Sequence, residues 1–240
     1  MRGVFVVFAA GTLASAVVLR GAPQSDSEQR SYARVGILRP HGNDTIDFEA
    51  GYLRHLEWHR QAGDRWAWYG WTISIGARQR SFVYATFGHA AASLDAPVSP
   101  AGDEADTIAN ITPHAHFEGS GLFEFVPKLS RGTGVPEPAA RVEFTTLELR
   151  PGSERAFEEA LAAEQSTLRG ETLWYRMVSG GRVPCYLRLR PRPTLAAILE
   201  ARSEQPFSDK VNSLIAEQII EVLTFRPTLS YGVGTGSSGR

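Results

Sequence analysis

Two histidines one helical turn apart are the first residues of this sequence that could do chemistry. His55 and His59 stand at positions i and i+4 of a helix predicted over residues 44–61, so both imidazoles can point to one side and chelate one metal ion. The glutamate placement of a zinc-protease helix is missing from the pattern. The pair predicts a site for a divalent metal or a haem. The competing interpretation is a pair that only covers a sheet or bonds to carbonyl groups.

A second histidine pair lies in a predicted loop. His114 and His116 flank one alanine, and in an extended chain both rings project to the same face. Such loop pairs can bind a metal, although most are solvated. All six histidines lie in the first half of the chain, at positions 41, 55, 59, 89, 114 and 116. Convergence of the second pair with the first pair, or with His89, would strengthen the metal prediction.

The densest aromatic cluster of the sequence predicts a ligand cavity. Five large rings occur within fourteen positions: Trp58, Trp66, Trp68, Tyr69 and Trp71. On a strand, Trp68 shares one face with small residues at positions 70, 72 and 74, which leave space for a flat ligand. Core packing alone is the more common explanation of such a cluster. The predicted ligand site is a hydrophobic cavity lined by Trp68, Thr72, Tyr84 and Thr86.

Other catalytic patterns are missing from the sequence. No Ser-His-Asp order, phosphate loop or dinucleotide fingerprint occurs, and the glycine-rich end from residue 233 to residue 240 precedes no helix, so it is predicted to be a flexible tail. Cys185 is the one cysteine, which excludes an intramolecular disulfide and a thiolate-rich metal site. Its apolar neighbours at alternate positions predict a packed core thiol.

Composition limits the partners of this chain. It has 240 residues, of which 42% are hydrophobic, enough to bury a full core. The 25 basic and 26 acidic residues give a net charge of -1, and the basic residues are spread along the sequence. Nucleic-acid binding needs a concentrated basic field, so no nucleic-acid partner is expected.

The elements that position these residues follow from an internal repeat. Four landmarks recur in the same order in the two halves. The matched segments are Ala33–Val35 and Ala140–Val142, Arg39–Gly42 and Arg150–Ser153, Trp71–Gly76 and Tyr175–Gly180, and Phe125–Ser130 and Phe225–Ser230. The sequence therefore predicts a duplication.

Each half has the predicted element order βαββαβ. In the first half the elements cover residues 34–38, 44–61, 66–75, 81–87, 104–111 and 122–126, and the connection over 90–102 is predicted to be a loop. In the second half they cover residues 142–149, 154–169, 172–179, 183–190, 194–202 with 209–217, and 219–225. A sheet with helices on one face leaves the other face uncovered. The predicted fold class is α+β: two tandem ferredoxin-like units whose antiparallel sheets pack together as an α+β barrel.

This arrangement resembles the dimeric α+β barrel superfamily in a tandem-duplicated form. The resemblance covers nearly all of residues 33–232 and rests on topology and repeat. In tandem form it is similar to the chlorite dismutase and dye-decolourising peroxidase families, and more loosely to NIPSNAP-type and antibiotic-biosynthesis-monooxygenase-type domains. The resemblance implies a ligand between sheet and helices or inside the barrel, and haem in many members. Those haem families carry their proximal histidine in the second half, where this sequence has no histidine.

The ends of the chain complete the predicted organisation. Residues 1–25 are typical of an export signal, with an uncleaved N-terminal anchor as the alternative, so the protein is expected to be periplasmic or extracellular. No stable membrane span is expected after cleavage. The first unit is predicted over 26–130, a linker over 131–139, and the second unit over 140–232.

Three functions stay open at the level of sequence. The first is an exported protein that binds a small apolar or aromatic molecule in a barrel cavity. The second is a haem- or metal-dependent oxidoreductase, monooxygenase-like, that uses the first-half histidines. The third is an interaction module that associates with itself as a homo-oligomer. The first is favoured because no acid, base or nucleophile pair stands out in the sequence.

Overall fold

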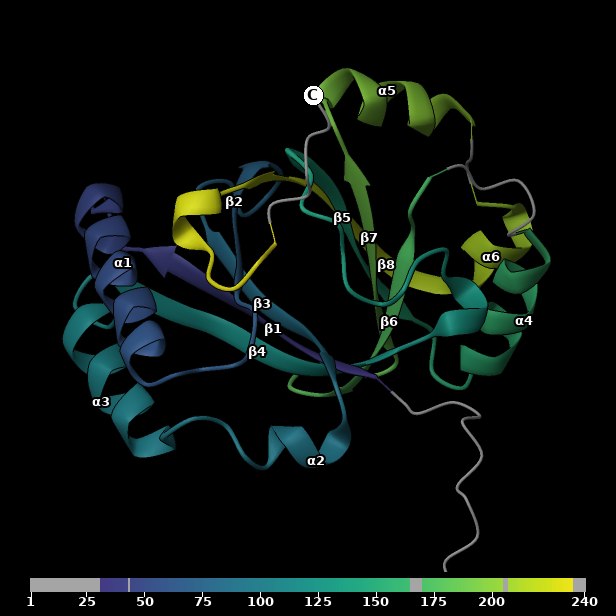
Figure 1. Ribbon diagram of the computed structural model, residues 1–240. Coiled ribbons are helices and arrows are strands. Elements are labelled where there is room, and N and C mark those ends of the chain that lie inside the picture. The colour runs from purple at the N-terminus through teal and green to yellow at the C-terminus, as the bar shows by residue number, and fades with distance from the viewer. Residues whose placement is uncertain (1–30, 43, 165–169, 205–206, 235–240) are drawn as a thin grey trace, which may run out of the picture.

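The computed structural model describes residues 31–42, 44–164, 170–204 and 207–234, and shows one closed eight-stranded barrel with helices on its outside (Figure 1). The strands are β1 Tyr32–Pro40, β2 Tyr69–Ile75, β3 Phe82–His89, β4 Ala115–Phe125, β5 Arg141–Leu149, β6 Leu173–Ser179, β7 Cys185–Arg192 and β8 Ile215–Phe225. The helices are α1 Thr45–Gln61, α2 Ala91–Leu94, α3 Pro100–Asn110, α4 Glu154–Glu164, α5 Leu195–Glu204 and α6 Asp209–Leu214.

The barrel consists of two four-stranded antiparallel sheets. Each half has its own sheet, with the order β4-β1-β3-β2 in the first and β8-β5-β7-β6 in the second. The pairs β2–β8 and β4–β6 close the barrel. Closure removes the free edges that each sheet would otherwise present. The predicted fold class, two ferredoxin-like units joined in an α+β barrel, is therefore confirmed.

The barrel interior is filled by apolar side chains of both halves. Tyr69, Trp71 and Ile73 of β2 point inward and pack against residues such as Phe144 and Leu223 of the second half. Because side chains alternate along a strand, Trp68 and the small residues that follow it face outward instead. The predicted cavity around Trp68 is thus not inside the barrel. It would have to lie between the sheet and the helices.

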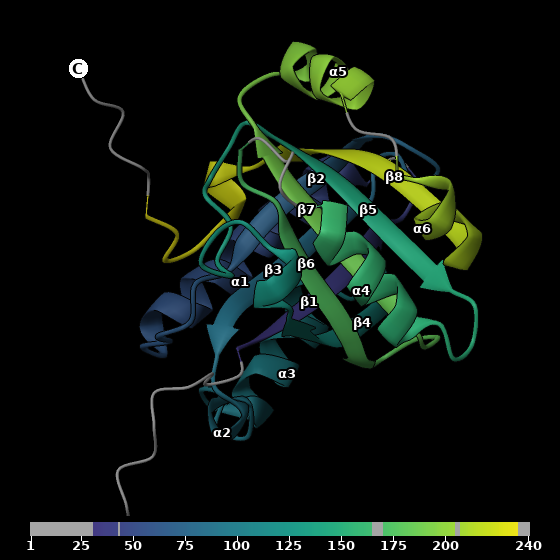
Figure 2. The same cartoon turned by 90° about the vertical axis from the view of Figure 1, so that its right-hand side faces the viewer.

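The helices cover the outer faces of the two sheets. Phe48, Tyr52 and Leu56 of α1 pack on Phe82 and Tyr84 of β3. In the second half, α4 packs on β6 and β7 through an equivalent cluster, and Figure 2 shows it in front of those strands. Each half therefore has its own core between sheet and helix, separate from the core inside the barrel.

Several boundaries differ from the prediction. The connection over 90–102, predicted to be a loop, contains α2 and the first turn of α3. Strand β4 begins at Ala115 rather than at residue 122, so His116 lies in a strand and not in a loop. Strand β8 begins at Ile215, where a helix was predicted to residue 217. The predicted export segment over 1–25, part of the tail and the end of the helix predicted over 154–169 lie outside the described residues.

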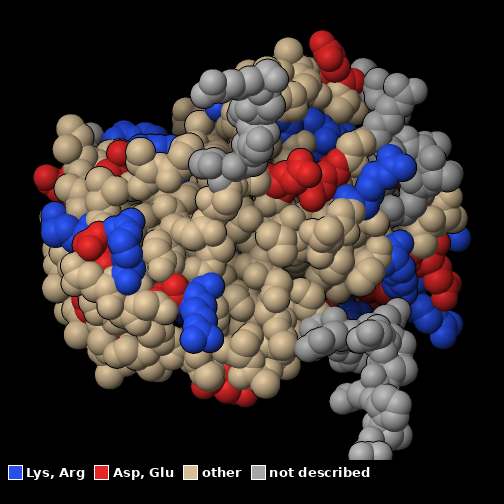
Figure 3. Space-filling model, viewed as in Figure 1, with Lys and Arg blue, Asp and Glu red and all other residues tan. Residues whose placement is uncertain are grey.

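None of the helices among the described residues is long and apolar enough to cross a membrane. On the face shown in Figure 3, Lys and Arg side chains lie among Asp and Glu side chains and form no continuous basic stripe.

Candidate functional site

A candidate metal site lies between α1 and α3 in the first half of the chain. The two helices pack side by side on the outer face of the first sheet (Figure 1). A glycine at the start of α3 permits this approach, because a Cβ atom on Gly102 would stand 3.0 Å from Cζ2 of Trp58 on α1. The first turn of α3 is thereby held against the face of α1 that carries His55 and His59.

Three ligand atoms converge at this contact. Nε2 of His55 lies 3.2 Å from Nε2 of His59, and Oδ1 of Asp103 lies 3.5 Å and 3.7 Å from these two nitrogens. A point equidistant from the three atoms lies about 2.0 Å from each, within the usual bond lengths of about 2.0–2.2 Å from zinc to nitrogen and oxygen. The triangle therefore has the dimensions of a metal site formed by two histidines and one carboxylate.

Two further carboxylates orient the imidazoles. Nδ1 of His55 donates a hydrogen bond of 2.8 Å to Oδ2 of Asp106. Nδ1 of His59 lies 2.8 Å from Oδ2 of Asp64, in an ion-pair contact rather than an aligned hydrogen bond. A carboxylate beside Nδ1 keeps the proton on that nitrogen and leaves the lone pair on Nε2. Both histidines are therefore prepared to bind a cation through Nε2.

A cation would stabilise this convergence of ligand atoms. Nε2 of His55 and Nε2 of His59 lie within hydrogen-bond distance of each other, which requires a proton on one of them. When both nitrogens are unprotonated, their lone pairs and the Asp103 oxygen repel each other unless an ion lies between them. Oδ1 of Asp103 is buried and accepts no hydrogen bond. An acceptor buried without a partner costs about 1–3 kcal/mol. A bound divalent ion would relieve both penalties.

The protonation state of His59 also suits a metal. Burial, and after it the charge of His55, lowers the pKa of His59 below its ordinary value, although Asp103 and Asp64 oppose the shift. The imidazole is therefore neutral at neutral pH, which is the form that binds a metal ion.

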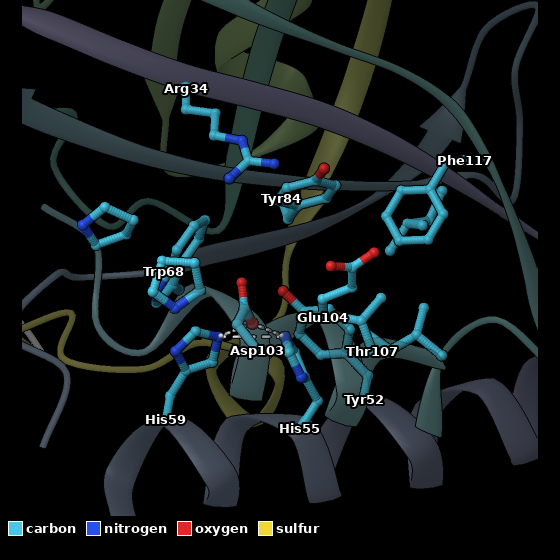
Figure 4. Close-up of a pocket in the computed structure, with 14 residues that line it drawn as sticks. Arg34, Tyr52, His55, His59, Trp68, Tyr84, Asp103, Glu104, Thr107 and Phe117 are labelled. Carbon is cyan, nitrogen blue, oxygen red and sulfur yellow. Dashed lines mark hydrogen bonds and ion pairs between the residues drawn. The ribbon is translucent and has the colours of Figure 1, made fainter. Parts of the chain in front are cut away.

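A cavity of about 290 Å³ adjoins the three ligand atoms. Figure 4 shows it between the helices, which carry His55, His59 and Asp103, and the sheet, which carries Arg34 and Tyr84. Its lining residues are Arg34, Leu38, Tyr52, His55, His59, Trp68, Tyr84, Pro97, Pro100, Asp103, Glu104, Thr107, Ile111 and Phe117. Eight of these residues are aromatic or apolar and six are polar or charged, so the cavity combines apolar walls with polar groups that could orient a small molecule.

Only part of the predicted ligand cavity belongs to this space. Trp68 and Tyr84 line it. Thr72 instead accepts a hydrogen bond of 3.0 Å from Arg226, and Thr86 bonds to Nε2 of His89 at 2.6 Å. Both threonines satisfy polar neighbours on the outer face of the sheet and lie outside the cavity.

The second predicted histidine pair does not join the first. His114 lies at the far end of α3, where its Nδ1 is 3.9 Å from Oδ2 of Asp44. His116 is exposed on β4, and its ring packs edge-on against that of His41 at 4.1 Å between centroids. Of the four histidines proposed as metal ligands, the structure brings together His55 and His59, and the third ligand atom comes from Asp103.

The sequence interpretation missed the three aspartates of the site. Asp103 and Asp106 are spaced i and i+3, which places both carboxylates on one helix face. In a βαββαβ unit the two helices cover the same sheet face, so this spacing beside a histidine pair is the signal that could have found them. The sequence interpretation did not use this spacing because the helix was predicted to begin after Asp103.

The paired histidines do not fit a haem. An axial histidine needs a flat space, as wide as the porphyrin, in front of its coordinating nitrogen. The Nε2 atoms of His55 and His59 face each other at 3.2 Å with Asp103 beside them, which leaves room for an ion and not for a macrocycle.

Several solved structures are similar to this chain. A monooxygenase-like protein from Lactobacillus acidophilus is 10% identical, with a TM-score of 0.57 over 85% of this chain and 97% of that chain. A chlorite dismutase variant from Candidatus Nitrospira defluvii is 8% identical, with a TM-score of 0.54 over 82% and 92%. A haem-binding protein from Thermus thermophilus is 12% identical, with a TM-score of 0.50 over 83% and 92%.

Identities this low establish the fold and not the activity. No protein-family model matches the sequence, and no curated protein matches it. The chain therefore shares the fold of these solved structures, here a closed α+β barrel built from two ferredoxin-like halves.

Proposed function

We propose that this protein is a metal-dependent oxidoreductase whose divalent ion is bound by His55, His59 and Asp103. The observation that carries the proposal is the triangle of three candidate ligand atoms with sides of 3.2, 3.5 and 3.7 Å. Of the three functions open at the level of sequence, this is the one that the site geometry favours. The cavity beside the triangle supplies the place for a small-molecule substrate.

The ligand set narrows the choice of metal. Two histidines and one carboxylate with open coordination positions are typical of non-haem iron(II) oxygenases, and the same set with a water ligand is typical of catalytic zinc. The name of one structural neighbour, a monooxygenase-like protein, supports an oxygen-activating metal such as iron. Iron at this site would supply open positions for dioxygen and substrate.

Metal analysis of protein purified without a histidine tag tests the proposal. The wild type is expected to bind one divalent ion per chain, and iron(II)-loaded protein is expected to consume oxygen with a suitable small substrate. His59→Ala and Asp103→Asn are expected to lose the ion. His116→Ala is the matched control, because His116 is an exposed histidine of the same half that lies outside the site.

Each outcome has a distinct meaning. A wild-type protein that binds no divalent ion at any ratio of ion to protein overturns the proposal. A tightly bound zinc without oxygen consumption replaces the redox assignment with a hydrolytic one. A Soret band in the absorption spectrum would indicate haem bound elsewhere in the protein and would make that group the candidate redox centre.

A further inference from the structure

We propose that the cavity beside the metal site recognises a small aromatic acid, whose carboxylate is bound by Arg34 and Tyr84. The inference rests on the proposed function in one respect only: the metal assignment determines which end of the substrate would react. Acid recognition itself depends on the sheet side of the cavity.

The first observation is a guanidinium group without an acidic partner. Arg34 lies on the outer face of β1 and lines the cavity. Its Nε donates to Oγ of Ser120 at 3.3 Å, and in the described part of the chain no carboxylate lies within ion-pair distance of it. Figure 4 shows the guanidinium on the wall opposite the histidines. Its remaining N–H groups are therefore available to a ligand.

The second observation is a phenol beside that guanidinium. Tyr84 of β3 pairs with Gly36, and Arg34 pairs with Thr86, so the two side chains are diagonal neighbours on one sheet face. The Tyr84 ring lies over Gly36, where a Cβ atom would stand 2.2 Å from the ring. Its hydroxyl makes no hydrogen bond within the described residues. A carboxylate between them would accept charge-assisted bonds from the guanidinium and a bond from the phenol.

The third observation is the shape and charge of the space between the two walls. Trp68 and Phe117 line the cavity on either side of its centre (Figure 4), and the volume of about 290 Å³ suits a ligand of one or two rings. Asp64 and Asp106 face the histidine Nδ1 atoms, and Asp103 is assigned to the proposed metal. Arg34 and Glu104 are then the charged groups left for a substrate. A ring with its acid group at Arg34 presents its far end to the metal.

Equilibrium binding to the zinc-loaded protein tests this inference without turnover. The probes are 4-hydroxybenzoate and its neutral analogue 4-hydroxybenzamide, followed by calorimetry. The acid is expected to bind the wild type about tenfold or more tighter than the amide, the usual gain from a charged hydrogen bond. Arg34→Met is expected to remove this preference and to leave amide affinity and zinc content unchanged.

Two further variants separate acid recognition from a general effect on the fold. Tyr84→Phe removes one hydroxyl and is expected to weaken acid binding severalfold. Glu104→Gln, the matched control at the cavity rim, is expected to maintain or strengthen it, because a negative charge is removed. Equal affinities of wild type for acid and amide overturn the inference. So does an acid preference that survives Arg34→Met.

The same samples distinguish this inference from the proposed function. A protein that binds zinc but shows no acid preference contradicts the inference and leaves the metal assignment standing. A protein that prefers the acid but fails to bind zinc or any other divalent ion supports the inference and contradicts the metal assignment.

Discussion

Gly51 on α1 lies so close to Asn110, the last residue of α3, that a Cβ atom at position 51 would stand 2.0 Å from the Asn110 carbonyl oxygen. Any side chain there must push the two helices apart. The same two helices carry His55, His59, Asp103 and Asp106 of the candidate metal site. The spacing of the ligand atoms therefore depends on a glycine that contacts none of them.

Gly51→Ala is expected to damage both stability and metal binding. The added methyl group should cost about 1–3 kcal/mol of unfolding free energy, as overpacking does, and should move Asp103 away from His55 and His59. Urea denaturation and metal titration measure the two effects. Gly234→Ala is the matched control, since open space surrounds that residue. A Gly51 variant as stable as the control would contradict the close approach of α1 and α3.

Asp64 and Asp106 are expected to raise metal affinity without touching the metal. Asp64 receives a hydrogen bond of 2.8 Å from Nε1 of Trp68 while it faces His59, and Asp106 bonds to His55. Asp64→Ala and Asp106→Ala should each weaken metal binding about 10- to 100-fold. Competition with a chelator of known affinity measures the change.

A matched substitution separates orientation from electrostatics. Glu57→Ala removes an exposed carboxylate from α1, the helix that carries His55 and His59, where Glu57 pairs with Arg60. It should leave metal affinity unchanged. If it weakens binding as much as Asp64→Ala does, general negative charge and not the orientation of His59 sets the affinity.

The fold could be predicted because the repeat carries structural information. The matched segments Phe125–Ser130 and Phe225–Ser230 both end a strand and enter a short 3-10 helix, in which Leu129 and Leu229 are buried. The buried leucine and the proline turn explain why both copies kept this pattern. Strand pairing between the halves, such as Trp71 with Phe225, joins residues more than 150 positions apart and leaves no mark in local sequence.

The site was predictable only where one element determines it. The helical period places His55 and His59 on one side, and the structure has them there. Asp103 directly follows a Pro/Asp-rich connection that was predicted to be a loop, so its contact with α1 was missed although its spacing from Asp106 was a usable signal. Thr72 was predicted to face a ligand. Its hydroxyl instead accepts a hydrogen bond from Arg226, which lies far away in sequence and also pairs with Glu49. Long-range polar contacts of this kind are invisible to strand periodicity.

Glu158 is expected to make the protein less stable in acid. Burial alone would raise the pKa of this carboxyl, but hydrogen bonds from Lys128 and Tyr186 and the charges of Lys128 and Arg176 outweigh burial, so the pKa lies below its ordinary value of 4.5. A depressed pKa gives stability that is present above the unfolded-state value and is lost as the pH falls through the folded-state value.

Unfolding free energies between about pH 6 and pH 3 test this contribution. Glu158→Gln should flatten the decline of stability with falling pH. Glu159→Gln should not, because Glu159 lies in an exposed pair with Arg155. Identical pH profiles for the Glu158 variant and the wild type would show that other carboxyls cause the acid sensitivity.

The thiol of Cys185 is expected to be inert in the folded protein. Burial, with a smaller contribution from Glu148, raises its pKa to about 11, and the residue is 3% exposed. The thiolate is the reactive form, so iodoacetamide should not label native protein at neutral pH and should label it fully in urea. Rapid native labelling would contradict the packed position of this side chain.

Glu143 is expected to be the most costly carboxylate to remove from the second half. It is 2% exposed, and its Oε1 accepts hydrogen bonds from Arg188 at 2.8 Å and from Arg190 at 3.3 Å. Burial lowers the pKa of Arg188 to about 10, so the guanidinium still carries its charge at neutral pH. Glu143→Gln would leave two buried cations without a carboxylate, which should cost about 3–5 kcal/mol.

A surface ion pair provides the comparison. Glu148→Gln breaks a contact of 3.4 Å with Arg182, whose side chain is 79% exposed, and such a loss should cost about 0–1 kcal/mol because water screens both charges. Urea denaturation of the two variants measures the difference. Similar costs would mean that water or an anion reaches Arg188 and Arg190. In that case the second half contains a hydrated cationic site where the structure places a buried ion pair.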